Sequence, residues 1–191
     1  MTQYTVFLDR DGVINHDSDA YIKHPDEFHF ISKSPDAIAL LNAKGFQVIL
    51  ITNQSAVGRG MISVRTLDAI LKKMTRGVEQ AGGRIKDIFF CPHGPNQGCD
   101  CRKPKPGMIL QAVACHGIDL KKAFMIGDSA KDIECGKNAG CAITILVKTG
   151  NGKKALAALT EKGIVPDFLA GDLYEAALWI TTNFSSENIV S

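Results

Sequence analysis

Apolar residues along this chain follow two spacings, and their alternation predicts the order of its secondary structure. Short continuous apolar runs, typical of buried strands, are separated by segments whose apolar residues repeat every three or four positions, as in helices. We expect strands at 4–8, 47–51, 85–90, 123–126, 142–147 and 167–170. We expect helices at 35–44, 108–116, 130–138, 153–162 and 173–182, and a longer helix with the apolar stripe Leu67, Ile70, Leu71, Met74 and Val78.

Strands that alternate with helices predict an α/β fold. We expect a doubly wound, Rossmann-like, mostly parallel sheet that is covered on both faces. The ligand site of such a sheet lies at the carboxyl ends of its strands. Boundary signals support the first helix, because Ser34 is a suitable N-cap and Pro35 suits the first helical position.

Length and composition narrow the class of protein. The 191 residues, of which 45% are hydrophobic, suit one domain, which we expect to span 1–184 with a flexible tail at 185–191. The net charge of +2 arises from 22 basic and 20 acidic residues without a run of one sign, which indicates neither a nucleic-acid nor a membrane partner. The sequence contains no secretory signal pattern and no apolar stretch of membrane-spanning length, so we expect a cytoplasmic monomer without disulfides among its six cysteines.

The first predicted strand ends in two carboxylates, Asp9 and Asp11, which Gly12 follows. Side chains two apart on an extended backbone point the same way, so these carboxylates converge on one small volume. They stay ionised together only if a cation or a donor-rich ligand lies between them, and Mg²⁺ is the simplest candidate. The pattern predicts a phosphoryl-transfer site in which one Asp attacks phosphorus and the other handles the proton. The alternative is an ordinary turn, because Asp and Gly are common turn residues.

Polar residues also follow other predicted strands, where they face the same crevice. Thr52-Asn53-Gln54-Ser55 offers a hydroxyl and amides suited to phosphate oxygens, and Gly127-Asp128 supplies a carboxylate, with Asp132 one helical turn later. Between them, Arg102 and Lys103 supply fixed positive charge for a phosphoryl dianion. Each piece alone has an ordinary explanation as a cap, a turn or a solvated loop, but their joint occurrence favours one site.

A second cluster combines three thiols and one imidazole within a short loop. Cys91, His93, Cys99 and Cys101 satisfy the four ligands of a closed structural Zn²⁺ site, in a loop at 91–106 that is rich in Gly and Pro. The alternatives are buried free cysteines or a redox pair of Cys99 and Cys101. A zinc ion here would fix the adjoining cations in place. The other three cysteines fit small buried apolar positions and are Cys115, Cys135 and Cys141.

The motifs together resemble those of the haloacid dehalogenase-like (HAD) phosphohydrolase superfamily, and they span most of the chain. The resemblance implies that Asp9 is the nucleophile that forms a phosphoaspartate, and that Asp11 protonates the leaving oxygen and later activates water. It implies that Thr52 and Lys103 hold the phosphoryl oxygens. Magnesium would be bound by Asp9, the main-chain carbonyl of Asp11, and Asp128, while Asp132 orients the groups around it. The role of Ser129 stays open, because relatives often carry a charged residue there.

One branch of that superfamily is most similar, namely the D-glycero-D-manno-heptose 1,7-bisphosphate phosphatases of lipopolysaccharide and S-layer sugar synthesis. The motifs that carry this likeness are Asp-Arg-Asp-Gly, Thr-Asn-Gln-Ser before Gly-Arg-Gly, Cys-Pro-His, and Cys-Asp-Cys-Arg-Lys-Pro. The likeness implies a phosphorylated sugar substrate and no separate cap domain. The implied substrate contacts are Asp17, Tyr21, Asn53, Gln54, Ser55, Arg59 and Arg102.

The sequence also leaves alternatives for the substrate and the class of protein. Histidinol-phosphate phosphatases are near relatives of this branch, and Asp17, Asp19 and Tyr21 would suit the amine and imidazole of that substrate. Another small sugar or polyol phosphate is also compatible. Outside the phosphatases, we consider a phospho-receiver signalling domain, whose acceptor Asp lies on a different strand from its acidic pair. A zinc-dependent nucleic-acid-binding module is disfavoured by the near-neutral charge.

Overall fold

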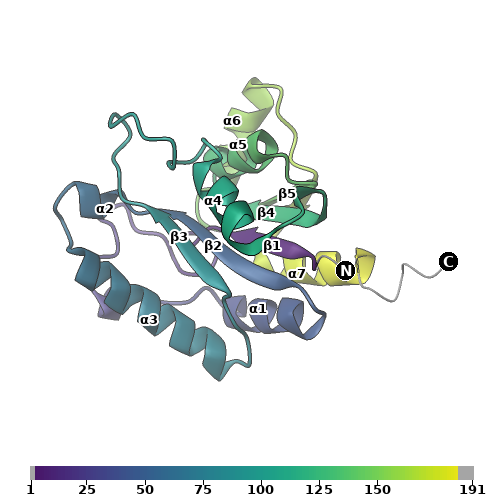
Figure 1. Ribbon diagram of the computed structural model, residues 1–191, viewed down its shortest axis with the longest axis horizontal. Helices are drawn as coiled ribbons and strands as arrows, with labels where there is room; N and C mark the ends of the chain where they lie inside the picture. Colours follow the sequence, from purple (N-terminus) through teal and green to yellow (C-terminus); the bar gives the residue numbers. More distant parts are fainter. Residues whose placement is uncertain (1–2, 185–191) are drawn as a thin grey trace.

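The apolar runs form the strands of a parallel sheet in a computed structural model that describes residues 3–184 (Figure 1). The sheet order is β3-β2-β1-β4-β5-β6, and every adjacent pair is parallel. The strands are β1 (Thr5–Leu8), β2 (Gln47–Asn53), β3 (Asp87–Cys91), β4 (Ala123–Gly127), β5 (Ile143–Val147) and β6 (Phe168–Ala170). The predicted doubly wound α/β fold is confirmed.

Helices cover both faces of this sheet, as Figure 1 shows. Side chains alternate along β1, so that Val6 and Leu8 pack on one face and Phe7 on the other. The first face carries α1 (Ser34–Ala43), α3 (Val64–Gln80) and α7 (Leu173–Asn183), and the second carries α4 (Gly107–His116), α5 (Ala130–Ala139) and α6 (Gly152–Glu161). The remaining short helices are α2 (Ser55–Gly58) and the 3₁₀ turns η1 (Pro25–Glu27) and η2 (Leu120–Lys122).

The hydrophobic stripe predicted for the long helix is buried on α3, so the helical spacing identified its inner face correctly. Its first turn is capped by Ser63, whose hydroxyl accepts a hydrogen bond from the Thr66 N–H at 3.0 Å. No helix of the described chain is long and apolar enough to cross a membrane. The expected tail at 185–191 lies outside the described residues.

Several local predictions are wrong. Lys33, in the left-handed region with φ of 61°, precedes α1 in place of Ser34, and the Ser34 hydroxyl instead donates to the Ile14 carbonyl at 2.6 Å. The strand expected to end at residue 51 continues to Asn53, because Thr52 and Asn53 still pair with β3. Cys135 is buried as expected, whereas Cys141 is partly exposed and Cys115 is exposed.

The strand order places the site-bearing strands at the centre of the sheet. β1 lies between β2 and β4, and the connections from these strands run to opposite faces, which opens a crevice at their carboxyl ends. Asp9 follows β1 and Asp128 follows β4, so their side chains meet at this point. The fold therefore brings together carboxylates that are far apart in the sequence.

Candidate active site

Asp9 is held at the end of β1 by its own backbone and by two donors. Its N–H donates to the Ile126 carbonyl of β4 at 3.0 Å, which continues the pairing of β1 and β4 past the last residue of β1. Its Oδ1 accepts from the Arg10 N–H at 2.7 Å and pairs with the Lys103 ammonium at 2.8 Å. One oxygen of this carboxylate is thus fixed, which orients the other for chemistry.

Lys103 reaches the site through a buried network. Its Nζ pairs with Asp132 at 2.6 Å and with Asp9 at 2.8 Å, and it donates to the Ile51 carbonyl at 2.9 Å. Burial alone would lower the pKa of Lys103, but the carboxylates of Asp132 and Asp9 raise it above its ordinary value, so the ammonium stays charged. Asp132 is fully buried and also accepts from the Ser129 hydroxyl at 2.7 Å.

This arrangement gives Ser129 a role that the sequence left open. Its hydroxyl and its N–H, at 2.7 and 2.9 Å, both donate to Asp132 Oδ2 at the start of α5. Lys103 pairs with the other oxygen, Oδ1, so both carboxylate oxygens of Asp132 already have partners. We therefore infer that Asp132 orients Lys103 and α5 rather than binding a metal, as the family resemblance implies.

Asp11 lies in a donor-rich environment that sequence reasoning did not identify. The Arg10 guanidinium folds back onto this carboxylate, with Nη2 at 2.8 Å from both oxygens. The side-chain amides of Asn15 and Gln54 each donate to it at 2.9 Å. Burial alone would raise the pKa of Asp11, but the charge of Arg10 and these hydrogen bonds lower it. The ionised carboxylate is favoured, and it is suited to accept a proton from water.

Asp128 is enclosed by two loops, one after β1 and the other after β5. The Asn151 N–H donates to Asp128 Oδ2 at 2.7 Å. Gly12 and Gly150, both with positive φ, pack so closely on this carboxylate that a Cβ at either position would collide with it. Glycine is therefore required at both positions, because the backbone lies close to the Asp128 carboxylate and because its φ is positive. The loop after β5 was not assigned to the site from the sequence, although the polar run Thr149-Gly150-Asn151 at a strand end was the available signal.

The carboxylates at this point fit a divalent cation. Asp9, Asp128 and Asp132 place oxygens within 4.8 Å of one another. Burial raises the pKa of Asp9 to about 7 despite Lys103, and burial together with the charge of Asp9 raises the pKa of Asp128 to about 8. Two such carboxylates ionise together more readily beside a cation, and Mg²⁺ prefers oxygen ligands. Because both oxygens of Asp132 already have partners, Asp9 and Asp128 are the two carboxylates suited to bind the cation.

The residues around the end of β2 form hydrogen bonds mainly with other residues of the site. The Gln54 amide donates at 2.9 Å to both Thr52 Oγ1 and Asp11, which links the second motif to the first. The Asn53 amide forms a reciprocal pair with the backbone of Lys103, at 3.1 and 3.3 Å. These contacts position Thr52 and Lys103. They also use many of the side-chain amide donors and acceptors of Asn53 and Gln54 that we expected to bind substrate.

A cavity of about 480 Å³, here named the catalytic cleft, lies over these groups. Most predicted site residues line it, whereas Thr52, Gln54 and Asp132 are buried beneath it. Arg59 lies exposed just after α2 and does not line the cleft, so the structure does not bring it to the site. The predicted residues in the lining are Asp9, Asp11, Asp17, Tyr21, Asn53, Ser55, Arg102, Lys103 and Asp128.

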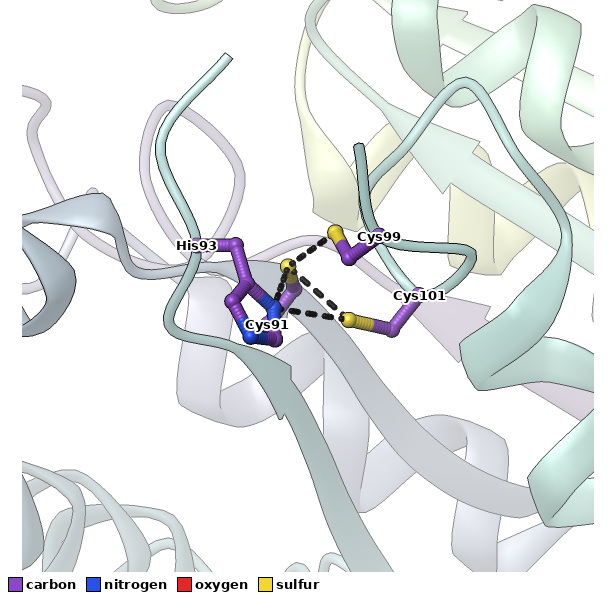
Figure 2. Close-up of side chains that lie close together, drawn as sticks. All are labelled: Cys91, His93, Cys99 and Cys101. Atoms are coloured by element: carbon purple, nitrogen blue, oxygen red, sulfur yellow. Dashed lines mark hydrogen bonds between the residues drawn. The ribbon is translucent and has the colours of Figure 1, made fainter. Parts of the chain in front are cut away.

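The predicted zinc ligands converge on one another, as Figure 2 shows. The four ligand atoms lie within 4.8 Å of one another. Cys91 Sγ lies 3.1 Å from Cys101 Sγ and 3.6 Å from Cys99 Sγ, and His93 Nδ1 lies 3.3 Å from Cys101 Sγ. A tetrahedral zinc site with Zn–S bonds of about 2.3 Å needs sulfurs about 3.8 Å apart, so this cluster is slightly contracted but fits the ion.

The cysteine loop is connected to the catalytic groups through the backbone. The Cys91 carbonyl accepts from the Gln54 N–H at 2.7 Å, and the Pro92 carbonyl accepts from the Gly58 N–H at 3.0 Å. Arg102, directly after the last cysteine, donates to the His93 carbonyl at 2.8 Å. A metal in this loop would therefore fix the cations that border the catalytic cleft.

Comparisons with known proteins agree with this geometry. A sequence profile of the HAD-hydrolase-like family matches residues 100–176. The D-glycero-beta-D-manno-heptose-1,7-bisphosphate 7-phosphatase of Bordetella bronchiseptica is 48% identical over 152 residues, which cover 80% of this chain and 84% of that protein. The chain belongs to this family of HAD-like phosphatases. The Pseudomonas aeruginosa relative is 44% identical and covers 89% of this chain and 96% of its own length.

Solved structures support the same family. The crystal structure of the B. bronchiseptica D,D-heptose 1,7-bisphosphate phosphatase with magnesium and phosphate has a TM-score of 0.87 and 42% identity, and the match covers 94% of this chain and 98% of that one. The Burkholderia thailandensis enzyme has a TM-score of 0.72 and 35% identity, with 93% and 98% covered. The predicted HAD-type α/β fold is confirmed. The family assignment favours the phosphatase over the phospho-receiver and nucleic-acid-binding alternatives.

Proposed function

We propose that this protein is a magnesium-dependent phosphatase that removes the 7-phosphate of D-glycero-D-manno-heptose 1,7-bisphosphate through a phosphoaspartate. The observation that carries the proposal is the Asp9 carboxylate, which pairs with Lys103 and lies in the lining of the catalytic cleft with an oxygen within 4.8 Å of an Asp128 oxygen. A nucleophile, a fixed cation and a metal-binding carboxylate are the parts that phosphoryl transfer to an enzyme carboxylate requires.

In the proposed mechanism, the free oxygen of Asp9 attacks phosphorus, a new O–P bond forms, and the bond to the sugar oxygen breaks. Asp11, in its protonated form, donates its proton to the leaving oxygen. The resulting carboxylate, which its surroundings favour, then accepts a proton from the water whose attack on phosphorus breaks the bond to Asp9. Lys103 supplies a fixed positive charge beside the phosphoryl oxygens, and the Thr52 hydroxyl holds one of them. Magnesium, held by Asp9, Asp128 and the Asp11 carbonyl, would neutralise charge on the phosphoryl group.

The proposed substrate belongs to the synthesis of lipopolysaccharide or S-layer sugars. Its support is the substrate named for the relatives, together with a cleft whose lining includes Asp17, Tyr21 and Arg102. A second candidate is histidinol phosphate, because the amine of that substrate would suit Asp17 and Asp19 in the lining.

We expect heptose 1,7-bisphosphate to have a higher kcat/KM than histidinol phosphate and fructose 1,6-bisphosphate at one fixed Mg²⁺ concentration. Release of inorganic phosphate measures the rates, and ³¹P NMR of the product determines which phosphate has been removed. A preference of tenfold or more for histidinol phosphate, equal to about 1.4 kcal/mol in transition-state binding, would show the heptose proposal to be wrong.

We also propose that Cys91, His93, Cys99 and Cys101 bind one structural zinc ion. The support is the convergence of four suitable ligand atoms in the loop at 91–106, which buries little apolar surface of its own. Further proposals that follow the sequence are a single catalytic domain over 1–184, a cytoplasmic location and a monomeric state.

Elemental analysis of protein purified without chelator is expected to give about one zinc per chain. Cys101→Ser should lose this zinc, lower the melting temperature and raise KM, because Arg102 and Lys103 follow directly in the chain. Cys115→Ser is the matched control, since Cys115 is exposed and lies outside the cluster. Protein with wild-type activity and no zinc contradicts the proposal.

A further inference from the structure

The catalytic cleft shares lining residues with two smaller cavities, and the shared residues differ in charge. One, of about 450 Å³, shares Asp17, Ser18, Asp19 and Asn151 with the cleft, and we name it the acidic side. The other, of about 310 Å³, lies against the cysteine loop, and we name it the basic side. The residues that it shares with the cleft are Arg102, Lys103 and Lys131.

The charge of the basic side is only partly compensated, because Lys103 is paired with Asp9 and Asp132, whereas Arg102 and Lys131 form no ion pair within residues 3–184. Among the described residues that line it, none is an Asp or a Glu. Its fourth cation, Lys105, is paired with the exposed Asp100 at 2.9 Å and does not line the cleft. An anion beside the reacting phosphate would therefore be attracted to the basic side and repelled by the carboxylates of the acidic side.

The three shared cations differ in how many of their donors are free. Lys103 has three N–H groups, and its contacts with Asp9, Asp132 and Ile51 use all of them. Arg102 donates through Nη1 to the His93 carbonyl, which leaves donors on its other nitrogens. Lys131 is exposed, and its ammonium has no ion pair or hydrogen bond within residues 3–184. It is the cation of this border that is free to bind a further anion.

Lys131 is also well placed by its helix. It lies in the first turn of α5, directly before Asp132, whose carboxylate is fixed by Lys103 and Ser129. The ion pairs of Lys103 with Asp132 and Asp9 therefore fix the position of the Lys131 backbone relative to Asp9. A long side chain on a rigid base can reach a ligand without ordering a loop.

We propose that Lys131, with Arg102, binds the phosphate that stays on the substrate and thereby selects bisphosphates over monophosphates. The inference rests on the proposed function, because it assumes that the other phosphate reacts at Asp9. The sugar hydroxyls, which are hydrogen-bond donors, then face the carboxylates of the acidic side. Sequence reasoning looked for this anchor at Arg59 and Arg102, of which Arg102 lines the cleft and Arg59 does not.

The test compares two substrates that differ only in the second phosphate, heptose 1,7-bisphosphate and heptose 7-phosphate. We expect Lys131→Ala to lower the ratio of their kcat/KM values by about tenfold or more, mainly through KM for the bisphosphate, and Lys131→Glu to lower it further. Lys131→Arg should retain most of the ratio. Lys137→Ala is the matched control, because Lys137 lies on the same helix, lines none of these cavities and forms only an exposed pair with Asp167.

The outcomes separate this inference from the proposed function. If wild-type protein hydrolyses neither substrate, the proposed function fails. If it hydrolyses both with equal efficiency, or if Lys131→Ala leaves the ratio within twofold of wild type, the phosphatase stands and the Lys131 anchor is wrong. If Lys131→Ala lowers both activities equally, Lys131 acts on the reacting phosphate instead, which also overturns the inference.

Discussion

Replacing Asp9 by Asn is expected to abolish phosphatase activity, with a loss of at least about 10³-fold, while the protein remains folded. The amide keeps the size of the side chain and can still accept from the Arg10 N–H, but it removes the attacking charge and a proposed metal ligand. The fold survives because Lys103 keeps its pair with the fully buried Asp132. Phosphate release and circular dichroism on the same preparation measure the two effects.

Asp68→Asn is a suitable control, since this exposed carboxylate on α3 pairs only with Lys72 on the same helix. Substantial residual turnover in Asp9→Asn would exclude the covalent mechanism. Asp11→Asn provides a complementary observation, because it removes the base proposed for hydrolysis but leaves the nucleophile. Phosphate label retained on the protein after rapid acid quenching would then identify the phosphoaspartate.

The sequence predicted which side chains come together where their placement is local or follows from strand ends. The pair Asp9 and Asp11 was identified because a strand end and two-residue spacing determine where both side chains point. The cysteine cluster was identified because its four ligands lie within one short loop. In both cases the geometry depends on neighbouring residues, and little of it depends on how distant segments pack.

Prediction was poorer where long-range contacts decide which partner a side chain takes. The fold places the Arg10 guanidinium on Asp11 and the Asn53 amide on the Lys103 backbone, and neither pairing has a sequence signal. Arg59 was expected near substrate because Gly-Arg-Gly follows the second motif, but it lies exposed just after α2 and does not line the cleft. Sequence patterns indicate which edge of a sheet a residue reaches, whereas the partner is set by packing.

The same network gives Lys103 a structural role besides its proposed role at the phosphoryl group. Its ammonium lies between Asp9 and Asp132, and its side chain is 2% exposed. Removing one member of a buried ion pair leaves an uncompensated charge, which typically costs about 3–5 kcal/mol. Lys103→Met should therefore lose activity and also lower the free energy of unfolding by about this amount, as measured by urea denaturation.

A second substitution separates the two roles. In Lys103→Met/Asp132→Asn the buried carboxylate is replaced by a neutral amide that can still accept from the Ser129 hydroxyl, so much of the lost stability should return. Activity should not return, because the phosphoryl group still lacks its cation. If Lys103→Met is as stable as wild type, the ion pairs do not stabilise the fold. If the double variant regains activity, the fixed charge of Lys103 is not required for catalysis, and the proposed role of this residue at the phosphoryl group is wrong.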